Sequence, residues 1–262
     1  MVLLAHGYGG SAPEVYLGLI DHLVGNGFIV VFPPYDAAFD PPAQYRTVEA
    51  GFEAALAATD REDTSRVGVV GHSFGAGMTP WLLQRLADDG RGADSTWSVM
   101  FAPWFALGVG EGPITVPGLD RAAVVAYDED VFVDGRIGIE IFRSLDLPDD
   151  RKDHVTVRSD RTRDPALIAD HLGPLSFPVP FLGTLSEDHL DRWSAYRTVD
   201  AVARCATDGR WCDTDLTDTG RWPDGTPVRR AEVSDRPTDV GPPALQECEF
   251  LLNPRPCPAP GR

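Results

Sequence analysis

Apolar runs and amphipathic stretches alternate along the first 160 residues of the chain. Val2–Ala5 is a short apolar run, and Glu14–Val24 carries apolar side chains at helical spacing. Phe28–Phe32 is a continuous β-branched and aromatic run that stops at two prolines. The same pattern predicts strands over Arg66–Val70, Thr96–Ala102, Arg121–Tyr127 and, last, Asp153–Arg158, and helices over Pro42–Thr59, Phe74–Asp88 and Val133–Leu145.

Strands and helices that alternate at this pace are typical of βαβ units. Strands of a parallel sheet are covered on both faces, which agrees with their uninterrupted apolar composition. The sequence therefore predicts an α/β fold, with a mostly parallel sheet between two helical layers.

The pattern changes after residue 160. One more helix is expected over residues 189–205, whereas nine of the 23 prolines lie from Pro223 onward. Such a segment cannot form a run of helices or central strands. We expect residues 1–204 to form the core and residues 205–262 to pack on it as ordered loop, tied by the cysteines, Trp211 and Trp222.

The net charge of −17 narrows the range of partners. A surface this acidic repels nucleic acid and anionic membranes, so neither is an expected partner. No apolar run approaches the roughly 18–20 residues that a membrane span needs, so we expect no stable membrane insertion.

All four cysteines lie near the end of the chain, at Cys205, Cys212, Cys248 and Cys257. An even number in a loop-rich segment favours one or two disulfides and an oxidising compartment. Zinc is the weaker alternative, since there is no C-x-x-C pair and no histidine after His189. The disulfides favour secretion, although the first residues do not have the pattern of a signal peptide.

The motif Gly71-His72-Ser73-Phe74-Gly75 follows a predicted strand and opens a predicted helix. G-x-S-x-G in this context is a nucleophile elbow, a turn so tight that its flanking positions need glycine. Ser73 is therefore the candidate nucleophile, at the amino end of a helix whose N–H groups favour developing negative charge.

A second glycine-rich segment, His6–Gly10, follows the first predicted strand. Acyl transfer needs two backbone N–H donors aimed at the oxyanion. We expect one from Phe74, the residue after the nucleophile, and the other from Tyr8.

In these two motifs and in its strand–helix order the chain resembles the α/β-hydrolase superfamily over residues 1–175. Ala169–His171 and Trp222–Val228 resemble its chlorophyllase-like and dienelactone-hydrolase-like esterases. The resemblance implies a serine hydrolase that cleaves small-molecule carboxylic esters through a Ser-His-Asp triad, without a metal or organic cofactor. A non-catalytic binding protein of the same fold, or a peptidase, lactonase or acyltransferase, remains the alternative.

The resemblance also indicates the other two triad members. The acid should follow the strand Arg121–Tyr127, and the family's valine three residues later favours Asp130 over Asp128. The base should lie in the loop after the last core strand, which favours His171 over His189, whereas His154 lies inside a predicted strand.

Residues 103–120 form an irregular apolar segment after a predicted central strand. Such segments either build the acyl-binding wall or pack against helices. On the first alternative we expect Trp104 and Phe105, together with Tyr8 and His72, to contact substrate.

In the superfamily the His-Gly loop follows the third strand, but here it begins at His6. The resemblance therefore implies that the first strands are missing and that the native product is longer. Phe28–Phe32 would then form an apolar edge of the sheet, which is an aggregation hazard.

Overall fold

The computed structural model describes residues 1–36, 38–58, 64–176, 187–239 and 241–259. Within them one sheet has the strand order β2-β1-β3-β4-β5-β6-β7, parallel throughout except for the antiparallel pair β6–β7. Its strands are β1 (Val2–Ala5), β2 (Val30–Val31), β3 (Arg66–His72), β4 (Ser95–Phe101), β5 (Leu119–Tyr127), β6 (Lys152–Val157) and β7 (Glu232–Ser234).

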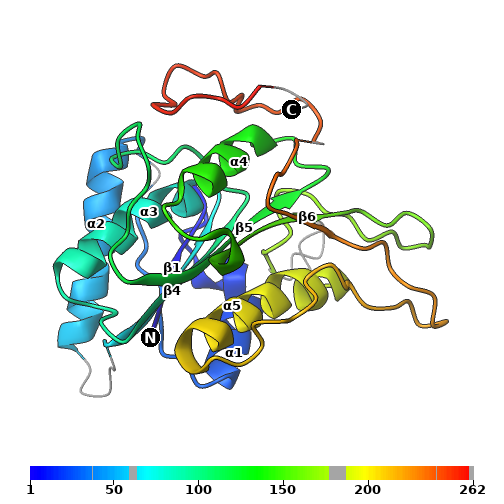
Figure 1. The fold of residues 1–262 in the computed structure, drawn as a ribbon, viewed down its shortest axis with the longest axis horizontal. Coiled ribbons are helices and arrows are strands. Elements are labelled where there is room, and N and C mark those ends of the chain that lie inside the picture. Colours follow the sequence, from blue (N-terminus) through cyan, green and yellow to red (C-terminus); the bar gives the residue numbers. More distant parts are fainter. Residues whose placement is uncertain (37, 59–63, 177–186, 240, 260–262) are drawn as a thin grey trace.

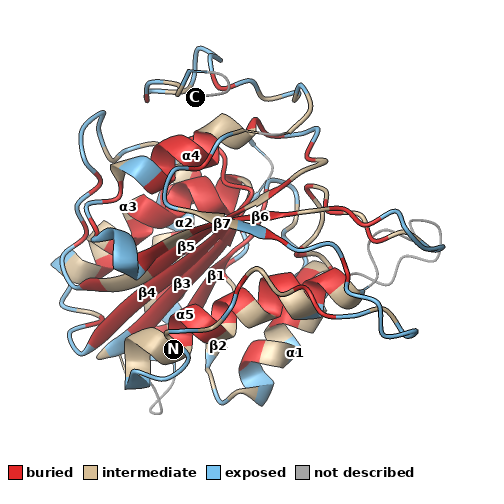
Figure 2. Ribbon diagram, turned by 45° about the vertical axis from the view of Figure 1, so that its right-hand side comes forward, coloured by how far each residue is buried: buried red, intermediate tan, exposed pale blue. Residues whose placement is uncertain are grey.

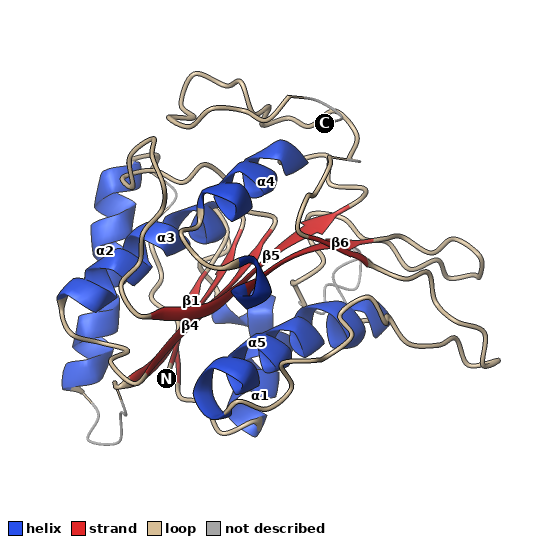
Figure 3. Ribbon diagram, in the orientation of Figure 1, coloured by secondary structure: helices blue, strands red, loops and turns tan. Residues whose placement is uncertain are grey.

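Helices cover both faces of the sheet (Figures 1 and 3). One face carries α2 (Pro41–Ala57), α3 (Phe74–Asp88) and α4 (Gly135–Ser144), and the other carries α1 (Leu17–Gly25) and α5 (Arg197–Asp208). Short single turns complete the helical segments: η1 (Pro13–Tyr16), η2 (Asp149–Arg151) and the π-helical η4 (Asp191–Tyr196). None of the described helices is both long and apolar enough to cross a membrane.

The core lies on both faces of the strands, which are buried over most of their length (Figure 2). Side chains of a strand alternate between faces, so Leu3 and Ala5 of β1 pack on the side of α2 and α3. Val2 and Leu4 pack on the side of α1 and α5. This confirms the predicted three-layer α/β fold and explains why β1, buried on both faces, has no polar position.

Most expected elements form within one to three residues of their predicted ends; Thr59, the expected end of α2, lies outside the described residues. The Phe28–Phe32 run forms the edge of the sheet as expected, but its strand, β2, has only two residues. One expectation was wrong: Asp153–Arg158 is not the last strand, because β7 pairs with β6. A three-residue strand has too little periodicity to be recognised in sequence. The proline-rich segment can supply it because an antiparallel edge needs few N–H donors.

Strand β2 is an edge strand, paired only with β1 among the described residues. Phe28 and Phe32 beside it are half-buried and pack against the cluster on the α1 side. Phe28 and Phe32 therefore bury part of their apolar surface without lengthening the β2–β1 strand pair.

The C-terminal segment runs from the α5 side, past β7, to the α4 side of the molecule, mostly as loop (Figure 1). It forms two local disulfides, Cys205–Cys212 and Cys248–Cys257, as expected from the even cysteine count. Trp222 ties the segment to the core, since its indole N–H donates to Asp160 at 3.0 Å. Trp211 does not, because it is 55% exposed.

Candidate active site

The elbow motif forms the tight turn that its glycines predict. Ser73 stands between β3 and α3 at φ 54°, ψ −119°, a conformation that costs strain in any residue with a Cβ. A Cβ on Gly75 would lie 2.1 Å from the carbonyl oxygen of Ala5, and one on Gly71 would lie 2.6 Å from Cα of Ala76. A side chain at either position would clash with these backbone atoms. Glycine at both positions therefore lets α3 pack closely against β1 and β3.

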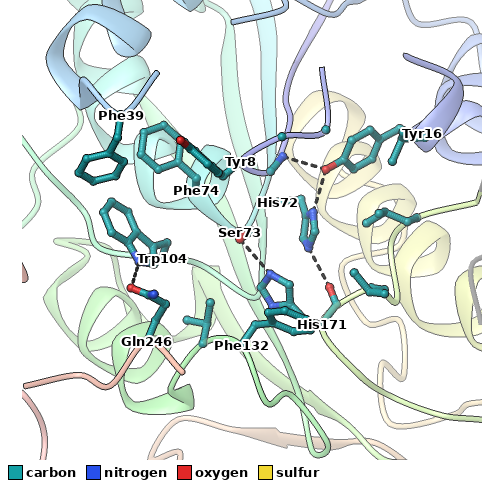
Figure 4. Close-up of a pocket in the computed structure, with 17 residues that line it drawn as sticks. Tyr8, Tyr16, Phe39, His72, Ser73, Phe74, Trp104, Phe132, His171 and Gln246 are labelled. Atoms are coloured by element: carbon teal, nitrogen blue, oxygen red, sulfur yellow. Dashed lines mark hydrogen bonds between the residues drawn. The ribbon is translucent and has the colours of Figure 1, made fainter. Parts of the chain in front are cut away.

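Three side chains from the carboxyl end of the sheet meet at this turn, and Figure 4 shows two of them, Ser73 and His171. The Ser73 hydroxyl lies 2.9 Å from Nε2 of His171, and Nδ1 of His171 lies 2.7 Å from Oδ2 of Asp130. The other carboxylate oxygen of Asp130 accepts the backbone N–H groups of Phe132 and Val133, at 2.8 and 3.0 Å. These bonds fix the carboxylate, so Nδ1 carries the proton and Nε2 is left to accept from Ser73.

The alternative acid and base lie elsewhere. Asp128 accepts the backbone N–H and the hydroxyl of Ser159, at 2.9 and 3.0 Å. His189 lies 2.8 Å from the carbonyl oxygen of Thr219. His154 lies inside β6, where burial lowers its pKa to about 4. None of these three contacts Ser73.

The two expected oxyanion donors line the pocket above Ser73. Phe74 is the first residue of α3, and the first N–H groups of a helix have no partner within it. Tyr8 lies in the loop after β1, whose Gly10 N–H bonds the carbonyl of Gly7 at 2.9 Å. Both residues therefore border the pocket that contains Ser73.

A buried chain of hydrogen bonds links the loop after β1 to the backbone of His171. The Tyr16 hydroxyl accepts the Gly7 N–H at 2.8 Å and lies 2.8 Å from Nδ1 of His72. Nε2 of His72 lies 2.8 Å from the carbonyl oxygen of His171. One proton arrangement satisfies every atom: Tyr16 donates to Nδ1, and Nε2–H donates to that carbonyl. Burial, and next the neighbouring His171, hold the pKa of His72 well below its usual value, so the ring stays neutral.

Sequence reasoning missed Tyr16, which it treated only as an apolar helix position. The available signal was chemical, because a buried tyrosine hydroxyl usually finds a hydrogen-bond partner. His72, an expected substrate contact, lines the pocket, but both of its ring nitrogens are engaged in the chain just described.

The pocket has a volume of about 660 Å³ and an aromatic wall on one side of Ser73 (Figure 4). The rings of Phe74 and Trp104 lie 5.3 Å apart, and Phe39 meets Trp104 edge-on at 6.0 Å. Phe105 does not line the pocket; it is fully buried behind Trp104 at 4.4 Å. The described lining includes no Asp, Glu, Lys or Arg, but it includes Gln246, which the sequence did not indicate.

Nothing in the described part of the chain gathers three or more histidine, cysteine or acidic side chains in a way that could hold a metal ion.

No protein-family model and no curated protein sequence matches the chain. Among solved structures, it is similar to a fungal esterase from Rhizomucor miehei, with 15% identity, coverage of 79% of this chain and 74% of that one, and a TM-score of 0.51. An esterase from Pseudomonas putida (16%; 60% and 63%; 0.42) and one from Pyrobaculum calidifontis (16%; 60% and 65%; 0.41) also match.

The sheet order, the elbow after β3 and the likeness to the Rhizomucor miehei structure identify the α/β-hydrolase fold. At this identity the likeness concerns the fold alone. The narrower resemblance to chlorophyllase-like and dienelactone-hydrolase-like esterases stays a prediction.

Proposed function

We propose that the protein is a serine hydrolase of carboxylic esters, with Ser73 as nucleophile, His171 as general base and acid, and Asp130 as the residue that orients the base. The observation that carries the proposal is the unbroken hydrogen-bond series Ser73–His171–Asp130 on a strained elbow. Strain held at one residue with a reactive hydroxyl is a feature of functional sites.

In the proposed reaction, Nε2 of His171 takes the hydroxyl proton as Oγ of Ser73 attacks the ester carbonyl. The N–H groups of Tyr8 and Phe74 stabilise the tetrahedral oxyanion. The imidazolium then gives its proton to the leaving alcohol, and an acyl-enzyme forms. Water repeats the sequence, releasing the acid and restoring Ser73. Asp130 stays ionised and stabilises the imidazolium in both halves.

The pocket favours neutral esters over charged substrates. A carboxylate or ammonium group in this pocket would lose water without gaining a charged partner from the described lining. The chain's net charge of −17 further disfavours anionic substrates at long range. A pocket with this lining suits an ester better than a peptide, because peptides usually carry charged or strongly hydrated groups.

The same proposal assigns residues 1–204 to the catalytic core and residues 205–262 to an extension packed on it. Helix α5 crosses this division, and Cys205 lies on α5. The two disulfides support an oxidising compartment for this protein.

The test is turnover of p-nitrophenyl acetate and butyrate by the wild type and by Ser73→Ala. The alanine variant should lose essentially all turnover, while Ser65→Ala, remote from the pocket, should retain it. Equal turnover by the wild type and Ser73→Ala would refute the assignment.

A further inference from the structure

Gln246, from the C-terminal segment, enters the pocket beside Trp104 (Figure 4). Its Oε1 accepts the indole N–H of Trp104 at 3.3 Å. Because an indole can only donate, this contact fixes which end of the amide faces Trp104. The Nε2 group has no hydrogen-bond partner within the described residues and carries two N–H donors.

The backbone around Gln246 is paired with the loop that carries the proposed acid. The N–H of Leu245 donates to the carbonyl of Val131 at 2.9 Å, and the N–H of Gln246 donates to Phe132 at 2.8 Å. In return, the N–H of Asp134 donates to the carbonyl of Gln246 at 3.1 Å. Gln246 is therefore held by the same loop that orients Asp130.

Residues 247–257 are fastened to α4 and its N-terminus. The N–H of Cys248 donates to Asp134 at 3.0 Å, and Arg136 bridges Asp134 and Glu249. Arg255 is 4% exposed and pairs with Glu140 at 2.6 Å. The Cys248–Cys257 disulfide closes this segment. A side chain fixed this way loses little conformational freedom when it binds a ligand.

The groups around Gln246 indicate which kind of ligand its Nε2 donors would bind. Tyr16 and His72 engage their polar atoms with each other and with the backbone. The wall beside Gln246 is aromatic, formed by Phe39, Phe74 and Trp104. An N–H donor beside aromatic side chains is suited to a ligand that has a flat apolar ring and an oxygen acceptor on that ring.

We propose that Gln246 is a specificity-determining residue, whose Nε2 donates a hydrogen bond to an oxygen acceptor on the ring of a neutral aromatic ester. The ring would lie against the Phe39–Phe74–Trp104 wall while the ester carbonyl lies at Ser73. This inference rests on the proposed ester hydrolysis.

The test compares two substrates of similar shape, methyl 4-acetylbenzoate, which has an acceptor, and methyl 4-isopropylbenzoate, which has none. The acetate esters of 4-acetylphenol and 4-isopropylphenol place the ring on the alcohol side instead. The measured quantity is the ratio of kcat/KM for the acceptor ester to kcat/KM for its partner, because intrinsic ester reactivity cancels between enzyme variants.

Gln246→Leu should lower this ratio by about 3- to 10-fold in at least one pair, mainly through KM, as expected for one uncharged hydrogen bond. Gln246→Glu should lower this ratio further. The glutamate keeps an acceptor for the Trp104 N–H, but its other, negatively charged oxygen repels the substrate oxygen. Gln84→Glu adds the same charge on α3, where Gln84 bonds the Thr115 carbonyl, and should leave the ratio unchanged.

Fluorophosphonate labelling of Ser73 in every variant separates the possible failures. Intact labelling and turnover, with both Gln246 variants within about twofold of the wild-type ratio, would overturn the role of Gln246 alone. A wild type that is neither labelled nor active on any of the four esters would overturn the proposed hydrolysis, and this inference with it.

Discussion

Replacing Tyr16 by phenylalanine removes the hydroxyl that joins Gly7, in the loop after β1, to His72. The Gly7 N–H and Nδ1 of His72 would then be buried without their partner. An unsatisfied buried donor or acceptor costs about 1–3 kcal/mol, so the loss of stability should be about 2–6 kcal/mol. The ring itself stays, so no large cavity contributes to this figure.

The same change should slow catalysis. Without Tyr16, the loop that carries Tyr8 and the His72 ring that bonds the His171 carbonyl both lose a constraint. Because Tyr16→Phe keeps the ring that lines the pocket, kcat should fall about tenfold or more with little change in KM.

Urea unfolding and p-nitrophenyl butyrate kinetics measure the two effects of Tyr16→Phe. Tyr127→Phe is the matched control, since the Tyr127 hydroxyl is buried with no hydrogen-bond partner among the described residues. That variant should be neutral or slightly stabilised. If Tyr16→Phe costs no more than Tyr127→Phe in stability and keeps full kcat, the hydrogen-bond chain has no positioning role.

Three further predictions concern the acid, a buried histidine and a disulfide. Asp130→Asn should lower kcat by about 10⁴-fold, because the amide favours the wrong tautomer of His171; a loss under tenfold would argue against the assigned acid. Burial lowers the pKa of His154 to about 4, so the folded state binds fewer protons than the unfolded state between pH 6.5 and 4. Stability is therefore lost as pH falls through that window, by about 3 kcal/mol, and His154→Leu should flatten the urea-midpoint profile there; an unchanged slope would contradict this. Removing the Cys248–Cys257 disulfide with a double serine variant should lower the free energy of unfolding by about 2–3 kcal/mol. It should also lower the kcat/KM ratio between the acceptor esters and their partners, whereas removing Cys205–Cys212 should leave that ratio unchanged. Equal effects of the two removals on the ratio would count against a role of Cys248–Cys257 in positioning Gln246.

The sequence predicted the parts of the site that depend on neighbouring residues. The elbow at Ser73 and the helix after it follow from a strand, a serine and two glycines within a few positions. Asp130 and His171 also form the expected contacts. Their choice over Asp128 and His189 rested on family resemblance, because alternation along the chain does not tell which carboxylate of one turn faces the base.

The contacts that sequence reasoning missed join distant segments. Tyr16 and His72 are 56 residues apart, and Trp104 and Gln246 are 142 residues apart. No local pattern encodes such pairs, because they depend on how the C-terminal segment and α1 pack on the finished sheet. Strand β7 was missed for the same reason, since its three residues become a strand only beside β6.

The central claim, that Ser73 is an activated nucleophile, is tested most directly by a fluorophosphonate probe followed by tryptic mapping. We expect a single modified peptide that contains Ser73, no labelling of Ser73→Ala, and strongly slowed labelling of His171→Gln. Modification at another residue, or p-nitrophenyl butyrate turnover that survives in Ser73→Ala, would contradict it.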